Sequence, residues 1–270
     1  MEVRIEKIGP ERAKILLSTT RNRRLNPPHS AKFARDMEAG NWRPNSTIQI
    51  AKTADGECLI DGQHRLQAVI ITGRPQEFIV IYDVSVDDQA VIDTGRRRSL
   101  SDTLAIRGEA NTSLLAAAVA YIWREQQNLP PGSKMTPTIA EGLRLLGEHS
   151  ALKYGIQPTR IAVRQLRVPP GLACYLYYRM AGIDADCSDD FWHKLGTGLD
   201  LHARHPIYLL RGRLEANAAS TTVKLGSVVI HALAIKAWNA YVRGDEIGTL
   251  RWTRGGPTPQ PFPELEGPID

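Results

Sequence analysis

The pattern of secondary-structure signals changes near residue 100, and this change limits the fold more than any other feature of the sequence. Before it, short β-branched runs alternate with amphipathic segments, and after it, strand signals fade while helical periodicity dominates. This order predicts an α+β fold with a mainly α-helical second half. We expect a first domain over residues 1–105, a helical domain over 106–254 and an extended, proline-containing tail over 255–270.

Three strands are expected in the first domain, and the first two are joined by an Asp-Gly turn at residues 55–56. They are Ser46–Lys52, Glu57–Ile60 and Phe78–Val84. The helices expected there are Glu11–Leu17, Pro28–Gly40, Leu66–Ile71 and Asp87–Ile92.

The second half is expected to begin with a helix that starts at Ser99 or Ser101. Further helices are expected at Leu114–Glu125, Thr138–Glu148, Pro170–Ala181, Ser188–Leu195, Pro206–Ala216 and Thr222–Arg243. Residues 151–163 fit no single pattern.

Composition excludes several classes of protein. A 42% hydrophobic and 23% charged chain of 270 residues can build a core, and is neither disordered nor fibrous. No apolar stretch approaches the roughly 20 residues of a membrane span, and the N-terminus lacks the apolar region of a signal peptide. Three cysteines without a Cys-x-x-Cys pair fit reduced thiols, so we expect a cytoplasmic protein with no membrane partner. The net charge of +5 permits a polyanionic partner.

The most informative segment is Asp61-Gly62-Gln63-His64-Arg65, where an expected strand ends and an apolar-periodic helix begins. The start of a helix presents free N–H groups and the positive end of the helix dipole. Glycine admits close approach to the backbone, and Arg65 can bond a phosphate oxygen. His64 can add a donor or a proton-transfer group. The segment therefore indicates a phosphate site, although a plain turn with solvent-facing side chains fits the local pattern equally well.

Residues 23–84 resemble the ParB/sulfiredoxin superfamily in the order of their elements as well as in this motif. ParB proteins have Gly-Glu-Arg-Arg at the corresponding place, sulfiredoxins have Gly-Gly-Cys-His-Arg, and the free-serine kinases have Asp-Gly-His-His-Arg. Closer still are ParB-like proteins of phages and mobile elements, which continue into an Asp-Thr-Gly-Arg-x-Arg segment, as here from Asp93. The resemblance implies a nucleotide-binding domain with a small mixed sheet, whose ligand is a nucleoside triphosphate such as ATP or CTP, with Mg²⁺. It also implies DNA as a partner and a homodimer as a candidate assembly.

Two departures from the family motif reduce the number of family activities that we expect of this chain. Gln63 stands where sulfiredoxins have their reactive cysteine, so sulfiredoxin chemistry, which needs a thiolate, is not expected. Arg65 matches the second arginine of the ParB motif, but His64 replaces the first, which argues against a ParB-type clamp gated by CTP.

Two further basic clusters are candidate ligand contacts. Arg23 and Arg24 lie in a segment that borders the nucleotide site in the resembling family. The run Arg96-Arg97-Arg98 needs either solvent or an anion, since adjacent arginines repel, and it would bind phosphate or DNA backbone if the fold brings it near Gly62. Asp93, just before that run, could hold a metal, act as a base or simply cap the turn.

Other signals favour structure over chemistry. The tyrosines at 175, 177 and 178 could stack on nucleobases, but core packing is the commoner role. His202 and His205 lack a third ligand at metal-binding spacing, so no metal site is assigned. His231 lies in an apolar helix and indicates a core or interface histidine.

Three functions stay open from the sequence. The first is a nucleotide-binding, DNA-associated protein of phage or mobile-element type. The second is a phosphotransferase, NTPase or nuclease acting on a nucleotide, a small hydroxyl substrate or DNA, including DNA base modification, with Asp61, His64 and Asp93 as catalytic groups. The third is an inert structural or partner-binding scaffold.

Overall fold

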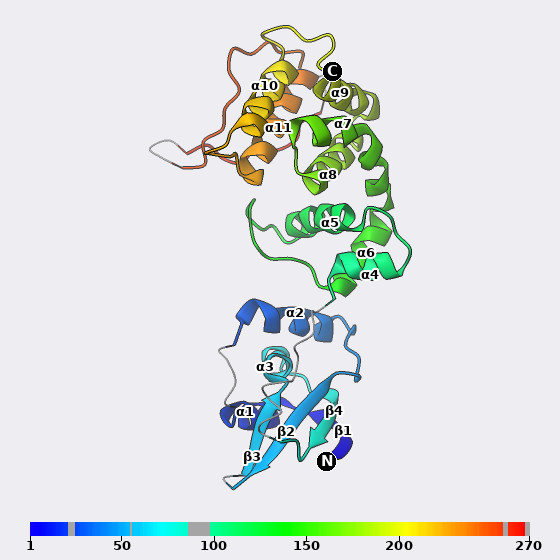
Figure 1. The fold of residues 1–270 in the computed structure, drawn as a ribbon, viewed down its shortest axis with the longest axis vertical. Helices are drawn as coiled ribbons and strands as arrows, with labels where there is room; N and C mark the ends of the chain where they lie inside the picture. The colour runs from blue at the N-terminus through cyan, green and yellow to red at the C-terminus, as the bar shows by residue number, and fades with distance from the viewer. Residues whose placement is uncertain (21–24, 55, 86–97, 256–258, 268–270) are drawn as a thin grey trace. The chain divides into compact units, whose positions relative to one another are not determined.

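The computed structural model describes residues 1–270 except 21–24, 55, 86–97, 256–258 and 268–270 (Figure 1). Contacts divide the chain into two units. The N-terminal unit is Met1–Arg98 together with Pro137–Glu141, and the helical unit is Ser99–Thr136 together with Gly142–Asp270. The expected α+β class is confirmed, with a mixed sheet and helices first and a mainly helical region after it.

The N-terminal unit contains a four-stranded sheet in the order β1-β4-β2-β3. Its strands are β1 (Glu2–Ile8), β2 (Thr47–Thr53), β3 (Gly56–Asp61) and β4 (Gln76–Tyr82). The β1–β4 and β2–β3 pairs are antiparallel and the β2–β4 pair is parallel, so the sheet is mixed as expected. Strand β1 was not expected from the sequence. Residues 2–6 do alternate polar and apolar side chains, as a strand does, and in this edge strand the apolar Val3 and Ile5 are exposed while Ile8 is buried.

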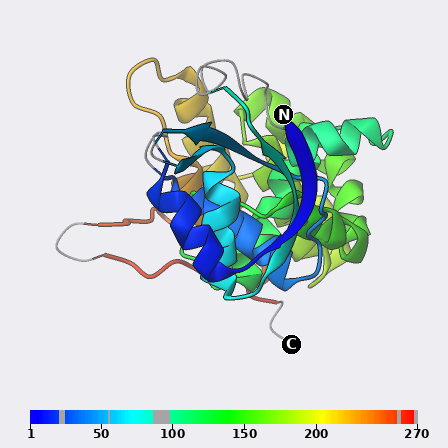
Figure 2. The same cartoon turned by 90° about the horizontal axis from the view of Figure 1, so that it is seen from below.

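Three helices complete this unit, namely α1 (Pro10–Ser18), α2 (Pro27–Glu38) and α3 (Gln63–Thr72). Helix α3 packs against both α1 and α2, and Figure 2 shows α1 and α3 side by side. Apolar side chains of all three helices join those of the four strands in one cluster, which includes Leu16, Ala34, Ile48, Leu66 and Phe78. The start of α3 is thereby fixed to the sheet by a packed core.

A short segment from later in the chain also belongs to the N-terminal unit. Thr138 and Glu141 form reciprocal hydrogen bonds, since each backbone N–H donates to the other's side chain. The Arg35 guanidinium pairs with the Glu141 carboxylate (Nε–Oε1 2.7 Å), and the Thr138 hydroxyl donates to Asp36 (2.6 Å). These bonds tie residues 137–141 to α2.

The helical unit is built from eight α-helices and one 3₁₀ segment among the residues described. They are α4 (Leu100–Ile106), α5 (Thr112–Gln126), α6 (Ile139–Glu148, whose first turn belongs to the N-terminal unit), η2 (Ser150–Gly155), α7 (Ile156–Leu166), α8 (Pro170–Ala181), α9 (Ala185–Thr197), α10 (Pro206–Ala219) and α11 (Ser227–Val242). The indeterminate stretch at 151–163 thus divides between a 3₁₀ turn and a helix. Helix α4 crosses the domain boundary expected at residue 105 and groups with the helical unit.

Two expected helix starts in the helical unit were wrong. Helix α9 begins at Ala185, three residues before Ser188, because the Asp184 carboxylate caps it by accepting the Cys187 N–H (2.9 Å). Helix α11 begins at Ser227 and not at Thr222. The preceding residues are held in another conformation, in which Asn217 Oδ1 accepts the Leu225 N–H (2.6 Å).

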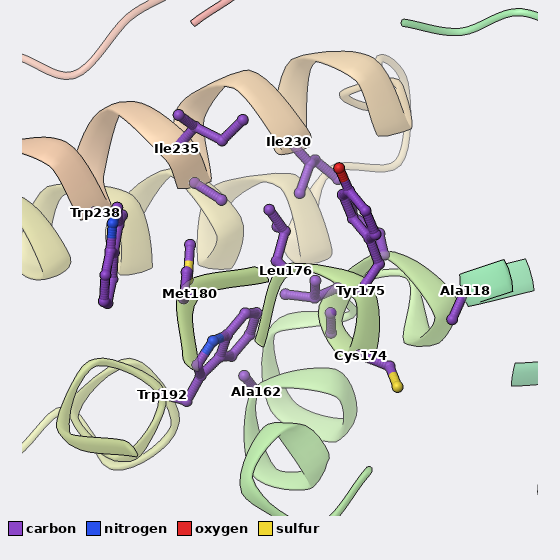
Figure 3. Packing of buried hydrophobic residues seen from close by; sticks show 14 of the residues in the cluster. Ala118, Ala162, Cys174, Tyr175, Leu176, Met180, Trp192, Ile230, Ile235 and Trp238 are labelled. Atoms are coloured by element: carbon purple, nitrogen blue, oxygen red, sulfur yellow. The ribbon is translucent and has the colours of Figure 1, made fainter. Parts of the chain in front are cut away.

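Helix α8 lies at the centre of the helical unit and is buried on nearly all sides. In Figure 3 its Tyr175 ring reaches toward Ile230 of α11, and Trp192 lies beside Ala162. A Cβ atom on Gly171 would lie 2.4 Å from the Ala117 Cβ, so the close crossing of α5 and α8 requires glycine there. Trp123, Trp192 and Trp238 fill the surrounding core.

The C-terminal residues 259–267 form neither helix nor strand. Their backbone is bonded to α11, since Trp238 Nε1 donates to Glu266 O (2.9 Å) and Asn239 Nδ2 donates to Glu264 O (2.7 Å). Across the described residues, no helix has the length and apolar character needed to cross a membrane.

Candidate functional site

The junction between β3 and α3 is built around Gly62. This residue precedes the first turn of α3 with φ of 108°, a conformation that residues with a Cβ rarely adopt. A Cβ there would also lie 2.4 Å from the Ile48 Cδ1 on β2. Glycine is therefore favoured by the backbone conformation, and a Cβ there would in addition force the end of the Ile48 side chain to shift.

The first turn of α3 is closed by backbone bonds alone. The amides of Arg65 and Leu66 both donate to Gly62 O at 3.0 Å, and no side chain caps the helix. Gln63 is only 5% exposed, so it is part of the packed junction and presents little surface to a ligand. The uncapped helix end retains the positive potential that favours an anion.

Asp61 and Arg65 form an ion pair across this junction. Arg65 Nη2 donates to Asp61 Oδ2 at 2.5 Å, and the Arg65 side chain is 19% exposed and that of Asp61 27%. The Nε of Arg65 is buried and has no hydrogen-bond partner in the part of the chain that the structure describes. A buried guanidinium N–H without an acceptor is costly, so this position favours an acceptor that comes from elsewhere.

His64 has a structural bond at the same junction. Its Nε2 accepts the backbone N–H of Asn26 (3.0 Å), the residue that precedes α2. Its ring packs edge-to-face on His29, with 4.9 Å between the ring centroids. While the bond to Asn26 is made, Nε2 is unprotonated and cannot donate to a phosphate.

The chain leading to the first arginine cluster is fixed beside β3. The Leu59 N–H donates to Thr19 Oγ1, the Thr20 hydroxyl donates to Leu59 O, and the Cys58 thiol donates to Thr19 O. Buried Cys58 is thus held by a backbone carbonyl and is not presented as a reactive thiol.

Several site residues expected from the sequence lie outside the described residues. These are Arg23, Arg24, Asp93, Arg96 and Arg97. Arg98 is described and exposed. The residues that the structure brings together are Asp61, Gly62, Gln63, His64 and Arg65.

No group of three metal-ligating side chains occurs within the described ranges. The histidine pair near residue 200 contributes to structure, since His205 Nδ1 accepts the Ile207 N–H at the start of α10 (3.1 Å). Burial lowers the pKa of His205, which keeps the ring neutral for that bond.

A cavity of about 890 Å³ lies within the helical unit, and the sequence analysis assigned none of its residues to a site. Its walls come from α5, the loop after α5, α8, α11 and residues 262–265. These segments are far apart in the sequence and form no motif, so no local signal could have grouped them.

In the comparisons with known proteins, the chain matches no protein-family model and no curated protein. The resemblance to the ParB/sulfiredoxin superfamily therefore rests on the residues of the junction and the order of elements around it.

Proposed function

We propose that this chain binds the phosphates of a nucleotide at the Gly62–Arg65 junction, and that it is a ParB-like, DNA-associated protein of phage or mobile-element type. One observation carries the proposal. The buried Nε of Arg65 lacks an acceptor among the described residues, and it belongs to the first turn of a helix that no side chain caps. A phosphate oxygen meets both requirements, since it accepts the guanidinium N–H and interacts favourably with the helix end.

Asp61 does not prevent this binding, because it uses only part of the guanidinium. Arginine has five N–H donors, and the bond to Asp61 is made by Nη2. The nucleotide is ATP or CTP, with Mg²⁺ offsetting the charge that Asp61 and the phosphates share.

Association with DNA is the second part of the proposal. It rests on the net charge of +5, the arginine-rich segments at 21–24 and 96–98, and the resemblance to ParB. Arginine contacts to backbone phosphates would make this binding strongly dependent on salt. A gel-shift titration of duplex DNA at rising NaCl tests it, and failure to bind at 50 mM NaCl would remove this part.

The geometry favours binding over acid–base catalysis at this junction. A general base needs a free lone pair within reach of its proton, but His64 Nε2 already accepts the Asn26 N–H. The Asp61 carboxylate is already engaged in the ion pair with Arg65. The enzymatic alternatives thus depend on residues other than these two, such as Asp93.

Calorimetric titration of ATP and CTP with Mg²⁺ tests the nucleotide site. The variants are Arg65→Met, which keeps the aliphatic stem, and Arg74→Met, which removes an exposed arginine of the same unit. We expect Arg65→Met to weaken binding about 10- to 100-fold, the loss for a charge-assisted hydrogen bond, and Arg74→Met to behave as the parent.

Equal affinity of Arg65→Met and the parent would refute the site. No binding of either nucleotide by the parent protein would instead favour the inert-scaffold alternative. Assaying each mixture for nucleoside diphosphate or phosphorylated product then separates a binding protein from an enzyme.

A further inference from the structure

The helical unit contains a preformed cavity that the proposed nucleotide site does not use. Its volume of about 890 Å³ lies in the range of small-molecule pockets. Helices α5, α8 and α11 form three walls, and the C-terminal residues 262–265 form another. All lining residues belong to the helical unit.

The C-terminal wall is held in place by a hydrogen-bonded segment. Asn239 accepts the Glu266 N–H (3.1 Å) and donates to Glu264 O, while Trp238 donates to Glu266 O. Trp252 Nε1 bonds Pro261 O on the other side of Phe262 (2.9 Å). Phe262 is thus fixed on both sides, and the cavity does not need to be assembled by its ligand.

His231 is the buried polar group of this cavity. Its residue surface is 9% exposed, and it makes no hydrogen bond in the described part of the chain, in contrast with His149 and His205, which do. Burial lowers the pKa of His231 to about 4, so the ring is neutral near pH 7. A neutral imidazole offers one N–H donor and one lone pair, and on this cavity-lining residue both are available to a ligand.

Aromatic rings surround this imidazole. Tyr121, Tyr175 and Phe262 meet it edge-to-face, with centroids 5.7, 5.6 and 4.9 Å away. Tyr121 and Tyr175 also stack on each other at 5.3 Å and 21°. All four residues line the cavity, so the part of its wall around His231 is aromatic and suits a flat ring.

Three of the four charged residues of the wall, Arg124, Glu125 and Arg179, have contacts that hold them, and the fourth, Glu264, is exposed. Glu125 pairs with Arg179 (3.0 Å) and accepts the Tyr175 hydroxyl (3.2 Å). The Arg124 guanidinium lies 5.4 Å from the Tyr121 ring centre, and its Nε donates to Met135 O. A charged ligand would have to displace these contacts, whereas an uncharged one would not.

We propose that this cavity binds a flat, uncharged heteroaromatic ring of nucleobase size, held between aromatic side chains and hydrogen-bonded to His231. Nucleobases are such rings, since one edge presents a donor and an acceptor side by side and both faces can stack. The cavity shares no residue with the Gly62–Arg65 junction. An experiment can therefore refute one of the two proposed sites without refuting the other.

Saturation-transfer NMR and calorimetry with adenosine and cytidine test the proposal, and ribose serves as the sugar control. His231→Leu removes the hydrogen-bonding groups and keeps a side chain of similar bulk. His193→Leu makes the same change at an exposed histidine of the same unit. We expect both nucleosides but not ribose to bind, His231→Leu to bind about tenfold more weakly, and His193→Leu to match the parent.

Phe262→Ala provides a second variant if His231→Leu does not fold. It removes one aromatic wall from a segment without helix or strand, and it should also weaken nucleoside binding. No binding of either nucleoside at millimolar concentration, or unchanged affinity in a folded His231→Leu protein, would overturn the proposal.

Adenosine 5′-phosphate tests the charge of the ligand. Affinity similar to that of adenosine supports an uncharged ring as the recognised group. Binding more than tenfold tighter, with the gain lost in Arg179→Gln, would overturn the assignment of an uncharged ligand.

Discussion

Replacing Gly62 with alanine should destabilise the N-terminal unit by roughly 2–6 kcal/mol. The new residue would keep φ of 108°, which costs about 1–3 kcal/mol for a residue with a side chain. Its Cβ would also lie 2.4 Å from the Ile48 Cδ1, well inside a van der Waals contact, and such overpacking adds about 1–3 kcal/mol.

Gly73→Ala is the matched control, since Gly73 also has positive φ (65°) but no atom within 4 Å of its Cβ position. It carries only the backbone penalty, about 1–2 kcal/mol. In thermal unfolding followed by circular dichroism, Gly62→Ala should melt at least about 4 °C below Gly73→Ala, since 1 kcal/mol shifts the midpoint of a domain this size by about 4–8 °C.

Shortening Ile48 should rescue the Gly62 variant. Ile48→Val removes the Cδ1 atom and by itself costs about 0.5–1.5 kcal/mol. In the double variant the two losses should be less than additive by about 1–3 kcal/mol. A Gly62→Ala protein as stable as Gly73→Ala, or strict additivity with Ile48→Val, would refute the close contact between the junction and β2.

Three further predictions concern charged groups. Burial lowers the pKa of His231 from 6.5 to about 4, so the unfolded chain binds this proton first as the pH falls. Stability present above about pH 6.5 should decline by about 3 kcal/mol toward pH 4, and urea unfolding of His231→Leu should lack this component. Glu141→Gln should cost about 1.5–3 kcal/mol in urea unfolding, because Arg35 loses a charged partner, and a loss below 0.5 kcal/mol would contradict this role. Asp61→Asn should tighten ATP binding roughly fivefold by calorimetry, since it frees Arg65 from a competing carboxylate, and weaker binding would instead point to Asp61 as a Mg²⁺ ligand.

The sequence was most informative where a signal is local. The junction is predicted by the Asp61-Gly62 pair, the apolar periodicity from Leu66 and the helix stop at Gly73. The structure has a strand, a glycine with positive φ and a helix there. The bond between His64 and Asn26 could not be foreseen, because it joins residues 38 positions apart. Its effect is large, since it occupies the nitrogen on which a catalytic role would depend.

Tertiary contacts also explain the segments that the sequence misassigned. Strand β1 exposes Val3 and Ile5 and is held by its pairing with β4, which burial patterns do not reveal. The start of α11 is delayed because Asn217, on α10, bonds the Leu225 N–H.

The sequence was also unable to identify which residues line the cavity of the helical unit. The tyrosine group near residue 175 suggested either base stacking or core packing, and the structure divides its members. Tyr178 bonds His149 and Tyr177 bonds Asp189, whereas Tyr175 stacks with Tyr121 in the cavity wall. Only the packing of α5, α8 and α11 determines which of these tyrosines lines the cavity.

Asp61, Arg65 and His64 of the junction already have bonding partners within the protein, and this limits the affinity of the junction for an anion. Asp61 neutralises much of the Arg65 charge, and His64 is held by Asn26, so the described residues offer an anion mainly one guanidinium edge and one helix end. Those contribute about 1.5–3 and 0.3–1 kcal/mol, respectively, which corresponds to millimolar binding at best. Micromolar affinity for a nucleotide would therefore require the arginines at 23–24 or 96–98, and their removal should weaken binding at least as much as removal of Arg65.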